Sequence, residues 1–205
     1  MLVMKFGGTS VGVAGNCERA LEIVRERVAL DPVVVVSALS GVTNQLVELC
    51  RGGAPHEPLL AAIDERHRSH ARVLGVPDAS VAALLAELRS DSSLAAEGHA
   101  LARADRDRVL AYGERLAAEL FASALSVRGT PARALHAGQA GLVTDDRFGQ
   151  AHPTPEAYAG LRTGLADRTR LPVVTGFIGR TSDGRTTTLG RGGSDYSAAL
   201  IGAAL

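Results

Sequence analysis

Lys5 is the only lysine among the 22 basic residues of this chain, and every other basic residue is an arginine. It is followed by Gly7, Gly8, Thr9 and Ser10. Glycines let a backbone approach a ligand closely, and consecutive N–H groups bind anions. A compact lysine charge could neutralise a transferring phosphoryl group where the wide arginine fork would not fit. The Gly-Lys-Ser/Thr ending of a P-loop is absent. Both a phosphate site and an ordinary Gly-Gly turn therefore fit this segment.

Residues 189–196 (Leu-Gly-Arg-Gly-Gly-Ser-Asp-Tyr) are the most specific stretch. Glycines precede an expected helix whose first turn holds Ser194 and Asp195. An anion would bind the N–H groups of this turn, with Arg191 as a carboxylate clamp. Asp195 would repel a phosphate, so we expect it to act indirectly, by orienting Lys5 or a metal-bound nucleotide. The alternative is a glycine-rich turn with an acidic residue near the N-cap.

Three further segments carry polar or flexible groups. Residues 37–44 bring several hydroxyls to the expected carboxyl end of a strand, where open α/β folds bind ligands, although Thr43 also fits a helix N-cap. Glu114 could bind an ammonium group or complement a helix dipole. Residues 176–179 (Gly-Phe-Ile-Gly) supply flexible backbone at a strand end.

The elements that must position these groups predict an α/β fold with a mainly parallel sheet. A strand, a helix capped by Asn16 and a β-branched strand form a βαβ unit within about 36 residues. Residues 59–127 are expected to form an inserted helical subdomain, and the chain ends inside an apolar helix, as a domain incomplete at its C-terminus would. Strands are expected at 2–6, 33–36, 132–135, 141–144, 172–177 and 186–189, and helices at 17–30, 43–51, 59–74, 78–89, 94–111, 113–127, 155–166 and 194–205.

Composition excludes several classes of protein. The 205 residues carry 22 basic and 22 acidic side chains, which argues against a general nucleic-acid binder. No segment has the length and apolarity of a membrane span. Cys17 and Cys50 are expected to be buried free thiols in a reducing cytoplasm. His67 and His70 share a helix face but lack partners at metal-ligand spacing, and all six histidines are expected to be surface or structural.

Five spaced motifs together resemble aspartate kinases, of the amino-acid kinase superfamily. They are residues 5–11, 37–44, 113–115, 176–179 and 186–196, in this order. The resemblance implies a three-layer α/β/α fold and an enzyme that uses Mg-ATP to phosphorylate the β-carboxylate of L-aspartate, in the pathway to lysine, threonine and methionine. It also implies a cytoplasmic protein with no membrane or nucleic-acid partner, which could form a homo-oligomer.

The resemblance also implies a role for each matching residue. Lys5 and Asp195 would be catalytic, Asp195 by organising the catalytic lysines, and no residue would hold a structural metal. Glu114 would bind the substrate ammonium group, and Arg191 would clamp a carboxylate. The phosphate site would comprise Lys5, Gly7, Gly8, Thr9 and Ser10. The aspartate site would comprise Ser37, Thr43, Glu114, Phe177, Arg191, Gly192, Gly193 and Ser194.

The sequence departs from the family pattern in one respect. The adenine and ribose site and a second catalytic lysine lie in sequence that follows the Gly-Gly-Ser-Asp helix in the family, and Lys5 is the only lysine here. We therefore interpret residues 1–205 as the N-terminal portion of an amino-acid kinase domain. Two alternatives stay open: a non-catalytic module that binds aspartate or a partner chain, and a related amino-acid kinase with another acceptor.

Overall fold

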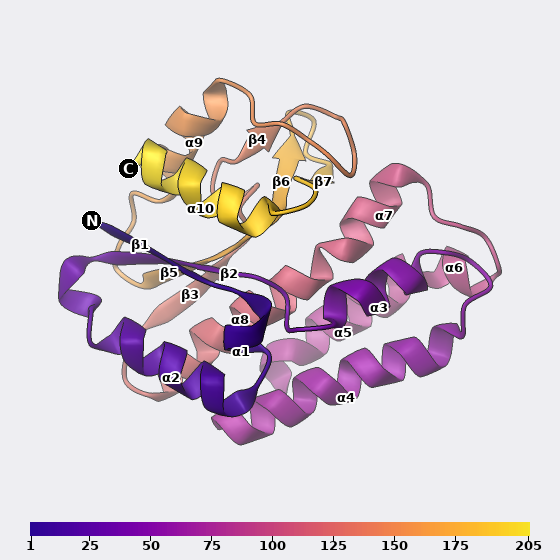
Figure 1. Cartoon of the computed structure of the whole chain (residues 1–205), viewed down its shortest axis with the longest axis horizontal. Helices are drawn as coiled ribbons and strands as arrows, with labels where there is room; N and C mark the ends of the chain where they lie inside the picture. Colours follow the sequence, from indigo (N-terminus) through magenta and orange to yellow (C-terminus); the bar gives the residue numbers. More distant parts are fainter.

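The computed structural model describes all 205 residues and is built on a four-stranded parallel sheet (Figure 1). The strand order is β1-β2-β5-β3, and every neighbouring pair is parallel. The predicted α/β class with a mainly parallel sheet is confirmed. The strands are β1 (Leu2–Phe6), β2 (Pro32–Val36), β5 (Leu171–Thr175) and β3 (Ala132–Leu135).

Alternating side chains of β2 enter two separate hydrophobic cores. Val34 and Val36 belong to the larger core, and Val33 and Val35 to the smaller one on the opposite face. Side chains alternate between the faces of a sheet, so a strand buried on both faces is apolar throughout. Helices cover both faces, which confirms the predicted three layers. The smaller core is closed by α9 (Glu156–Gly164) and α10 (Gly193–Ala204), and the larger by helices that include α2 (Ala14–Arg25), α3 (Val42–Leu49) and α8 (Tyr112–Val127).

The helical segment that follows α3 shares the larger core with the sheet. Helix α8 packs directly on β3 and β5, and it carries Phe121, whose ring stacks on Phe6 of β1 with centroids 5.6 Å apart. The segment therefore builds one layer of the fold, and its assignment as an insert at 59–127 stays a prediction. Its other members are α4 (His56–Leu74), α5 (Ala79–Asp91), α6 (Ser93–Ala96) and α7 (Arg103–Leu110).

The single helix predicted at 94–111 is wrong. Helix α6 ends at Ala96 and α7 begins only at Arg103. Gly98 adopts φ of 89°, a left-handed conformation that ends a helix, and Ala100 forms a β-bridge with Arg51. The break therefore joins this part of the chain to the loop after α3.

The C-terminal part of the chain also forms a second sheet, which has three strands. Its order is β4-β6-β7, comprising β4 (Val143–Thr144), β6 (Ile178–Thr181) and β7 (Thr186–Thr188). Sequence analysis missed β6 and extended the preceding strand to residue 177. The reason is Phe177, whose φ of 66° turns the chain between β5 and β6.

The two predicted helix caps are also wrong. Helix α2 begins at Ala14, and Asn16 lies inside it, where its side-chain amide donates to the Thr9 carbonyl at 3.1 Å. Helix α3 begins at Val42 because Gly41, with φ of 85°, turns the chain into the helix before Thr43. The helix predicted at 17–30 ends at Arg25, and a 3₁₀ turn, η1 (Val28–Leu30), follows it. The glycines after β1 lead at once into the short helix α1 (Gly8–Val11).

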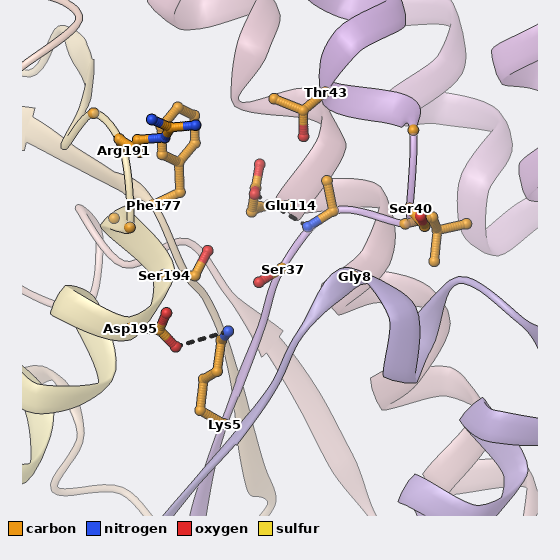
Figure 2. A pocket seen from close by; sticks show the side chains of 16 residues that line it. Lys5, Gly8, Ser37, Ser40, Thr43, Glu114, Phe177, Arg191, Ser194 and Asp195 are labelled. Atoms are coloured by element: carbon orange, nitrogen blue, oxygen red, sulfur yellow. Dashed lines mark hydrogen bonds and ion pairs between the residues drawn. The ribbon is translucent and has the colours of Figure 1, made fainter.

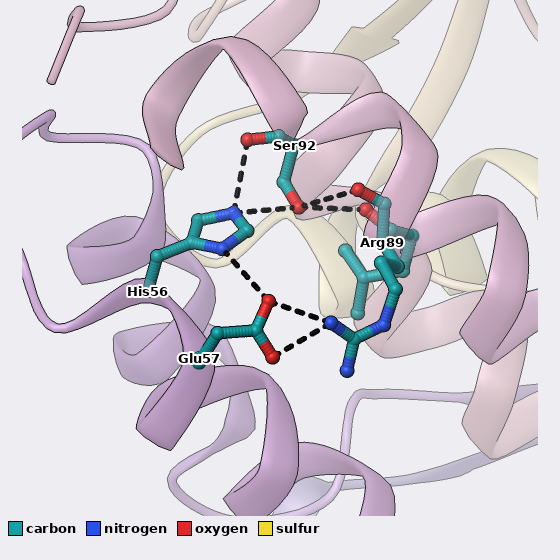
Figure 3. Close-up of polar contacts among 5 residues, drawn as sticks. His56, Glu57, Arg89 and Ser92 are labelled. Carbon is teal, nitrogen blue, oxygen red and sulfur yellow. Dashed lines mark hydrogen bonds and ion pairs between the residues drawn. The ribbon is translucent and has the colours of Figure 1, made fainter. Parts of the chain in front are cut away.

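A polar cluster joins the start of α4 to the end of α5 (Figure 3). His56 Nε2 lies 3.0 Å from the Ser92 carbonyl oxygen and 3.1 Å from Ser92 Oγ, and Arg89 donates to both oxygens of Glu57 at 2.6 and 2.7 Å. Ser92 is fully buried, and its hydroxyl donates to the Leu88 carbonyl at 2.8 Å. The cluster therefore holds two helices together and offers no accessible nucleophile.

Two helical glycines are expected to respond oppositely to alanine. A Cβ on Gly160 of α9 would lie 2.5 Å from the Gly141 carbonyl oxygen, whereas a Cβ on Gly15 of α2 meets nothing within 4 Å. Gly160→Ala should lower the free energy of unfolding by about 1–3 kcal/mol, because backbone must move. Gly15→Ala should raise it by about 0.5 kcal/mol, because alanine favours helix. Urea unfolding measures both, and equal effects would contradict the close approach of α9 to Gly141.

Candidate active site

A cavity of about 380 Å³ lies at the carboxyl ends of the central strands, between α10 on one side and α3 and α8 on the other (Figure 2). Parallel strands that end at one edge bring distant loops together, and open α/β folds bind ligands there. The structure places most of the predicted site residues in this one cavity. They are Lys5, Gly8, Ser37, Thr43, Glu114, Phe177, Arg191, Gly192, Gly193, Ser194 and Asp195.

Lys5 and Asp195 form an ion pair across the cavity floor (Figure 2). Lys5 Nζ lies 2.8 Å from Asp195 Oδ1, and the two side chains come from β1 and from the first turn of α10. The lysine side chain is 25% exposed, so its charge faces the cavity while the aspartate fixes its position. A Cβ on Gly7 would lie 3.4 Å from Lys5 Nζ, so the glycine keeps the space beside the ammonium group open.

Glu114 is a buried carboxylate with one unused oxygen. Its side chain lines the cavity, and the residue is 3% exposed. Oε1 accepts the backbone N–H of Ala38 at 3.1 Å, and Oε2 is buried without a hydrogen-bond partner. Burial raises the pKa of Glu114 to about 8, against the smaller opposing effect of the bond from Ala38. A cationic group in the cavity would supply the missing partner and favour the ionised form.

Close packing at Gly113 explains how Glu114 reaches the loop after β2. A Cβ on Gly113 would lie 2.8 Å from the Ala38 Cβ. The absence of a side chain lets the start of α8 touch this loop directly, which places the Glu114 carboxylate against the Ala38 N–H. Gly113 therefore permits the close approach that the hydrogen bond of Glu114 to Ala38 requires.

The N-terminus of α10 is seated against the turn between β5 and β6. A Cβ on Gly176 would lie 2.7 Å from the Ser194 Cβ, and a Cβ on Gly193 would lie 2.9 Å from the Phe177 ring. Ser197 Oγ accepts the Phe177 N–H at 3.0 Å and donates to the Gly193 carbonyl at 2.8 Å. These contacts hold the glycine-rich segment at the cavity wall. Arg191, at the wall, is exposed and forms no ion pair in the structure.

Three residues assigned to the phosphate site do not line the cavity. Gly7 lies beside Lys5 without lining it, whereas Thr9 and Ser10 border a separate hollow that they share with Phe6 and Asn16. The reason is that α1 begins at Gly8, so the residues after it rotate away from the sheet edge. The hydroxyls of Thr9 and Ser10 therefore lie outside the cavity that contains Lys5.

Sequence analysis also missed several lining groups. Ala38, Leu39, Ser40, Gly41 and Gly190 all border the cavity. All five lie in segments that the sequence had singled out as loops after strands. Ser40 is one of the hydroxyls expected there but was given no role, and no side-chain chemistry distinguished the other four. Ala38 contributes through its backbone N–H, a type of contact that sequence does not record.

The remaining titratable side chains stand apart from this cavity. His67 is fully buried, with Nδ1 2.7 Å from the Ile63 carbonyl oxygen, and Cys17 and Cys50 are buried free thiols, as predicted. Burial raises the pKa of each thiol to about 12. No group of three or more His, Cys, Asp or Glu side chains is arranged to hold a metal ion. None of the helices has the length and apolar character to cross a membrane.

Comparison with known proteins assigns the chain to a family. The model of the amino acid kinase family matches residues 1–205. The chain belongs to the amino acid kinase family. Within this family it is 37% identical over 203 residues to an aspartokinase of Chlamydia muridarum, and 37% identical over 212 residues to the lysine-sensitive aspartokinase 3 of Escherichia coli. The predicted resemblance to aspartate kinases is confirmed.

Solved structures of the family agree with this fold. The crystal structure of E. coli aspartokinase III in complex with aspartate and ADP superposes with a TM-score of 0.86 at 33% sequence identity. The match covers 100% of this chain and 46% of that one. The alignments with the relatives from C. muridarum and E. coli cover 45% and 46% of their lengths, so the chain spans about half of the proteins that it matches.

Protonation of Glu114 should make stability depend on pH. The folded chain keeps this proton up to about pH 8, whereas the unfolded chain releases it near the ordinary value of 4.5. Stability therefore falls as the pH rises between these values. From pH 5 to pH 9, Glu114→Gln should gain roughly 4 kcal/mol in unfolding free energy relative to wild type. Urea unfolding at three pH values measures this difference.

Glu119 lies on the same helix and is less buried than Glu114. Glu119→Gln is therefore the matched control, and its difference from wild type should show no such trend with pH. A pH-independent difference between Glu114→Gln and wild type would contradict the raised pKa.

Proposed function

We propose that this chain forms the amino-acid site and part of the phosphate site of an aspartate kinase. The reaction is transfer of the γ-phosphoryl group of ATP to the β-carboxylate of L-aspartate, giving 4-phospho-L-aspartate, the first step toward lysine, threonine and methionine. The observation that carries the proposal is the buried, unpartnered oxygen of Glu114 in one cavity with Arg191 and Lys5. Glu114 matches the ammonium group of aspartate, Arg191 matches a carboxylate, and Lys5 matches the phosphoryl group that is transferred.

Each polar group has a role in this proposal. Glu114 Oε2 accepts a hydrogen bond from the substrate ammonium group, which satisfies a buried acceptor. Arg191 clamps the α-carboxylate in the charge-assisted way that suits its planar fork. The N–H groups at the start of α10 and the hydroxyls of Ser37 and Thr43 complete the wall, and Phe177 closes it with its backbone.

The chemistry needs no general base. A carboxylate is ionised at neutral pH, so its oxygen attacks the γ-phosphorus directly while the bond from phosphorus to the ADP oxygen breaks. Catalysis then consists of positioning and neutralisation of charge. Lys5 supplies the positive charge at the transferring group, and Asp195 holds its ammonium group in place. The absence of histidine from the cavity lining agrees with this mechanism.

The wider setting follows from the same proposal. The phosphoryl donor is Mg-ATP, which enters as a substrate, and E. coli aspartokinase III, which was crystallised with aspartate and ADP, supports a nucleotide ligand. We infer a cytoplasmic enzyme that acts on small molecules, without nucleic-acid or membrane partners, and that could assemble as a homo-oligomer.

Calorimetric titration with L-aspartate tests the proposal directly, with Mg-ATP as the parallel ligand. We expect saturable aspartate binding that Glu114→Gln and Arg191→Ala each weaken at least about tenfold, because each leaves a charged ligand group unpaired. Arg25→Ala, an exposed arginine without an ion pair on α2, is the control and should bind like wild type. Preference for glutamate, acetylglutamate or a nucleotide over aspartate would overturn the substrate assignment. Phosphoryl transfer from ATP by this chain alone would rule out the alternative of a non-catalytic binding module.

Lys5→Arg tests the phosphate site. The arginine fork cannot replace a compact charge held 2.8 Å from Asp195, so in a full-length context phosphoryl transfer from Mg-ATP should fall by well over about tenfold relative to wild type. Release of ADP measures the rate, and aspartate affinity serves as the control for an intact amino-acid site. A rate equal to that of wild type would remove Lys5 from the mechanism.

A further inference from the structure

Asp107 is a buried carboxylate that lies outside the cavity and forms no ion pair. It lies on α7 and is 1% exposed. Its two oxygens accept three hydrogen bonds: from the N–H of Thr188 at 2.7 Å, from the N–H of Gly149 at 2.8 Å, and from Thr188 Oγ1 at 3.0 Å. Hydrogen bonds to an ionised acceptor are stronger than those between neutral groups. Three donors from two distant segments therefore converge on one side chain of the helical layer.

The first of these segments leads into the wall of the cavity. Thr188 is the last residue of β7, and Arg191 follows three positions later. The Thr188 carbonyl accepts the N–H of Ala151 at 2.9 Å, and the next residue, Leu189, donates its N–H to the Phe177 carbonyl at 2.8 Å. Asp107 thus fixes the amide of the residue from which the glycine-rich segment starts.

The second segment, at Gly149, lies directly against Gly190 of the same wall. A Cβ on Gly190, which has φ of 75°, would lie 3.2 Å from the Gly149 carbonyl oxygen. The Gly190 carbonyl in turn accepts the N–H of Gly193, the first residue of α10, at 3.0 Å. Because Asp107 holds both Gly149 and Thr188, a single carboxylate sets the position of the segment on two sides.

We propose that Asp107 is a positioning residue that places residues 189–193 at the cavity wall and so sets the affinity for the carboxylate-bearing ligand. The inference rests on the proposed function for the identity of that ligand. The placement itself follows from the hydrogen bonds and is measurable without any ligand. Asp107 touches no lining side chain of the cavity in this scheme and acts only through the backbone of Thr188 and Gly149.

Two substitutions separate the hydrogen bonds from the charge. The amide oxygen of Asp107→Asn accepts both N–H groups, and its NH₂ group donates to Thr188 Oγ1, so the geometry is kept. Asp107→Ala removes all three bonds and leaves two N–H groups without their acceptor. Asp105→Ala is the matched control, because Asp105 lies on the same helix and pairs only with Arg108 at 3.0 Å.

Hydrogen–deuterium exchange of the ligand-free protein is the first measurement. In Asp107→Ala, amides of residues 188–193 should exchange at least about tenfold faster than in wild type, while those of α2 stay unchanged. Asp107→Asn and Asp105→Ala should resemble wild type. Unchanged exchange at 188–193, or an equal increase along the whole chain, would overturn the proposal, since the latter marks a general structural role.

Affinity for L-aspartate is the second measurement, made on folded protein. Asp107→Ala should raise the Kd at least about tenfold, and Asp107→Asn should restore it to within about threefold of wild type. A local increase in exchange with an unchanged Kd would overturn the proposal. If wild type binds no aspartate while the exchange pattern is as expected, the proposed substrate fails and the positioning role stands.

A milder variant covers the case in which Asp107→Ala does not fold. Thr188→Val removes only the 3.0 Å bond to Asp107 Oδ1 and keeps the shape of a fully buried side chain. It should accelerate exchange at 188–193 by a smaller factor, about threefold, with α2 unchanged. Exchange equal to that of wild type in this variant would count against the proposal.

Discussion

The fold depends on a strand that is apolar on both faces. The four valines Val33–Val36 are completely buried and alternate between the two cores. Removing either helical layer would therefore expose two of these valines to water. At about 25 cal/mol per Å² of apolar surface, burial of each valine contributes on the order of 1.5 kcal/mol or more. The same strand ends at Val36, and the next residue, Ser37, lines the cavity. The strand that contributes most evenly to both cores therefore also fixes where the first loop of the cavity begins.

The strands and most of the site could be predicted from sequence, for physical reasons. Runs such as Val33–Val36 are β-branched and apolar throughout, and glycine-rich or hydroxyl-rich segments that follow such strands converge because parallel strands end at one edge. Eleven residues that these motifs and the family resemblance assigned to the site line one cavity, including the distant pair Lys5 and Asp195. Hydrophobic pattern and sheet topology were sufficient wherever the position of a site residue followed from a complete strand or helix.

Prediction failed where a single backbone angle or a distant partner decided it. Gly41 starts α3 before Thr43, and Gly98 interrupts a helical pattern that is otherwise continuous. Thr9 and Ser10 leave the cavity because α1 begins one residue before them. The hydrogen bonds of Asp107 reach residues 42 and 81 positions away, so no local pattern distinguishes it from an exposed acid of a charged helix.

Two polar groups that line the cavity lack a partner within the protein. Arg191 forms no ion pair, and Glu114 Oε2 is one of nine buried side-chain atoms without a hydrogen-bond partner. Buried polar groups are nearly always hydrogen-bonded, and exceptions concentrate at functional sites. These are the two groups to which the proposed function assigns the ammonium group and a carboxylate of the substrate.

The solitary lysine has a practical consequence. Because every other basic side chain is an arginine, Lys5 holds the only side-chain amine in the molecule, and it lies in the cavity. A reagent that acylates amines can therefore modify no side chain away from this site. Acylation located on Lys5 itself, as distinct from the α-amino group of Met1, reports whether its ammonium group is accessible, and a ligand that covers this group would protect it. The amino-acid composition therefore makes Lys5 a selective chemical probe of the candidate active site.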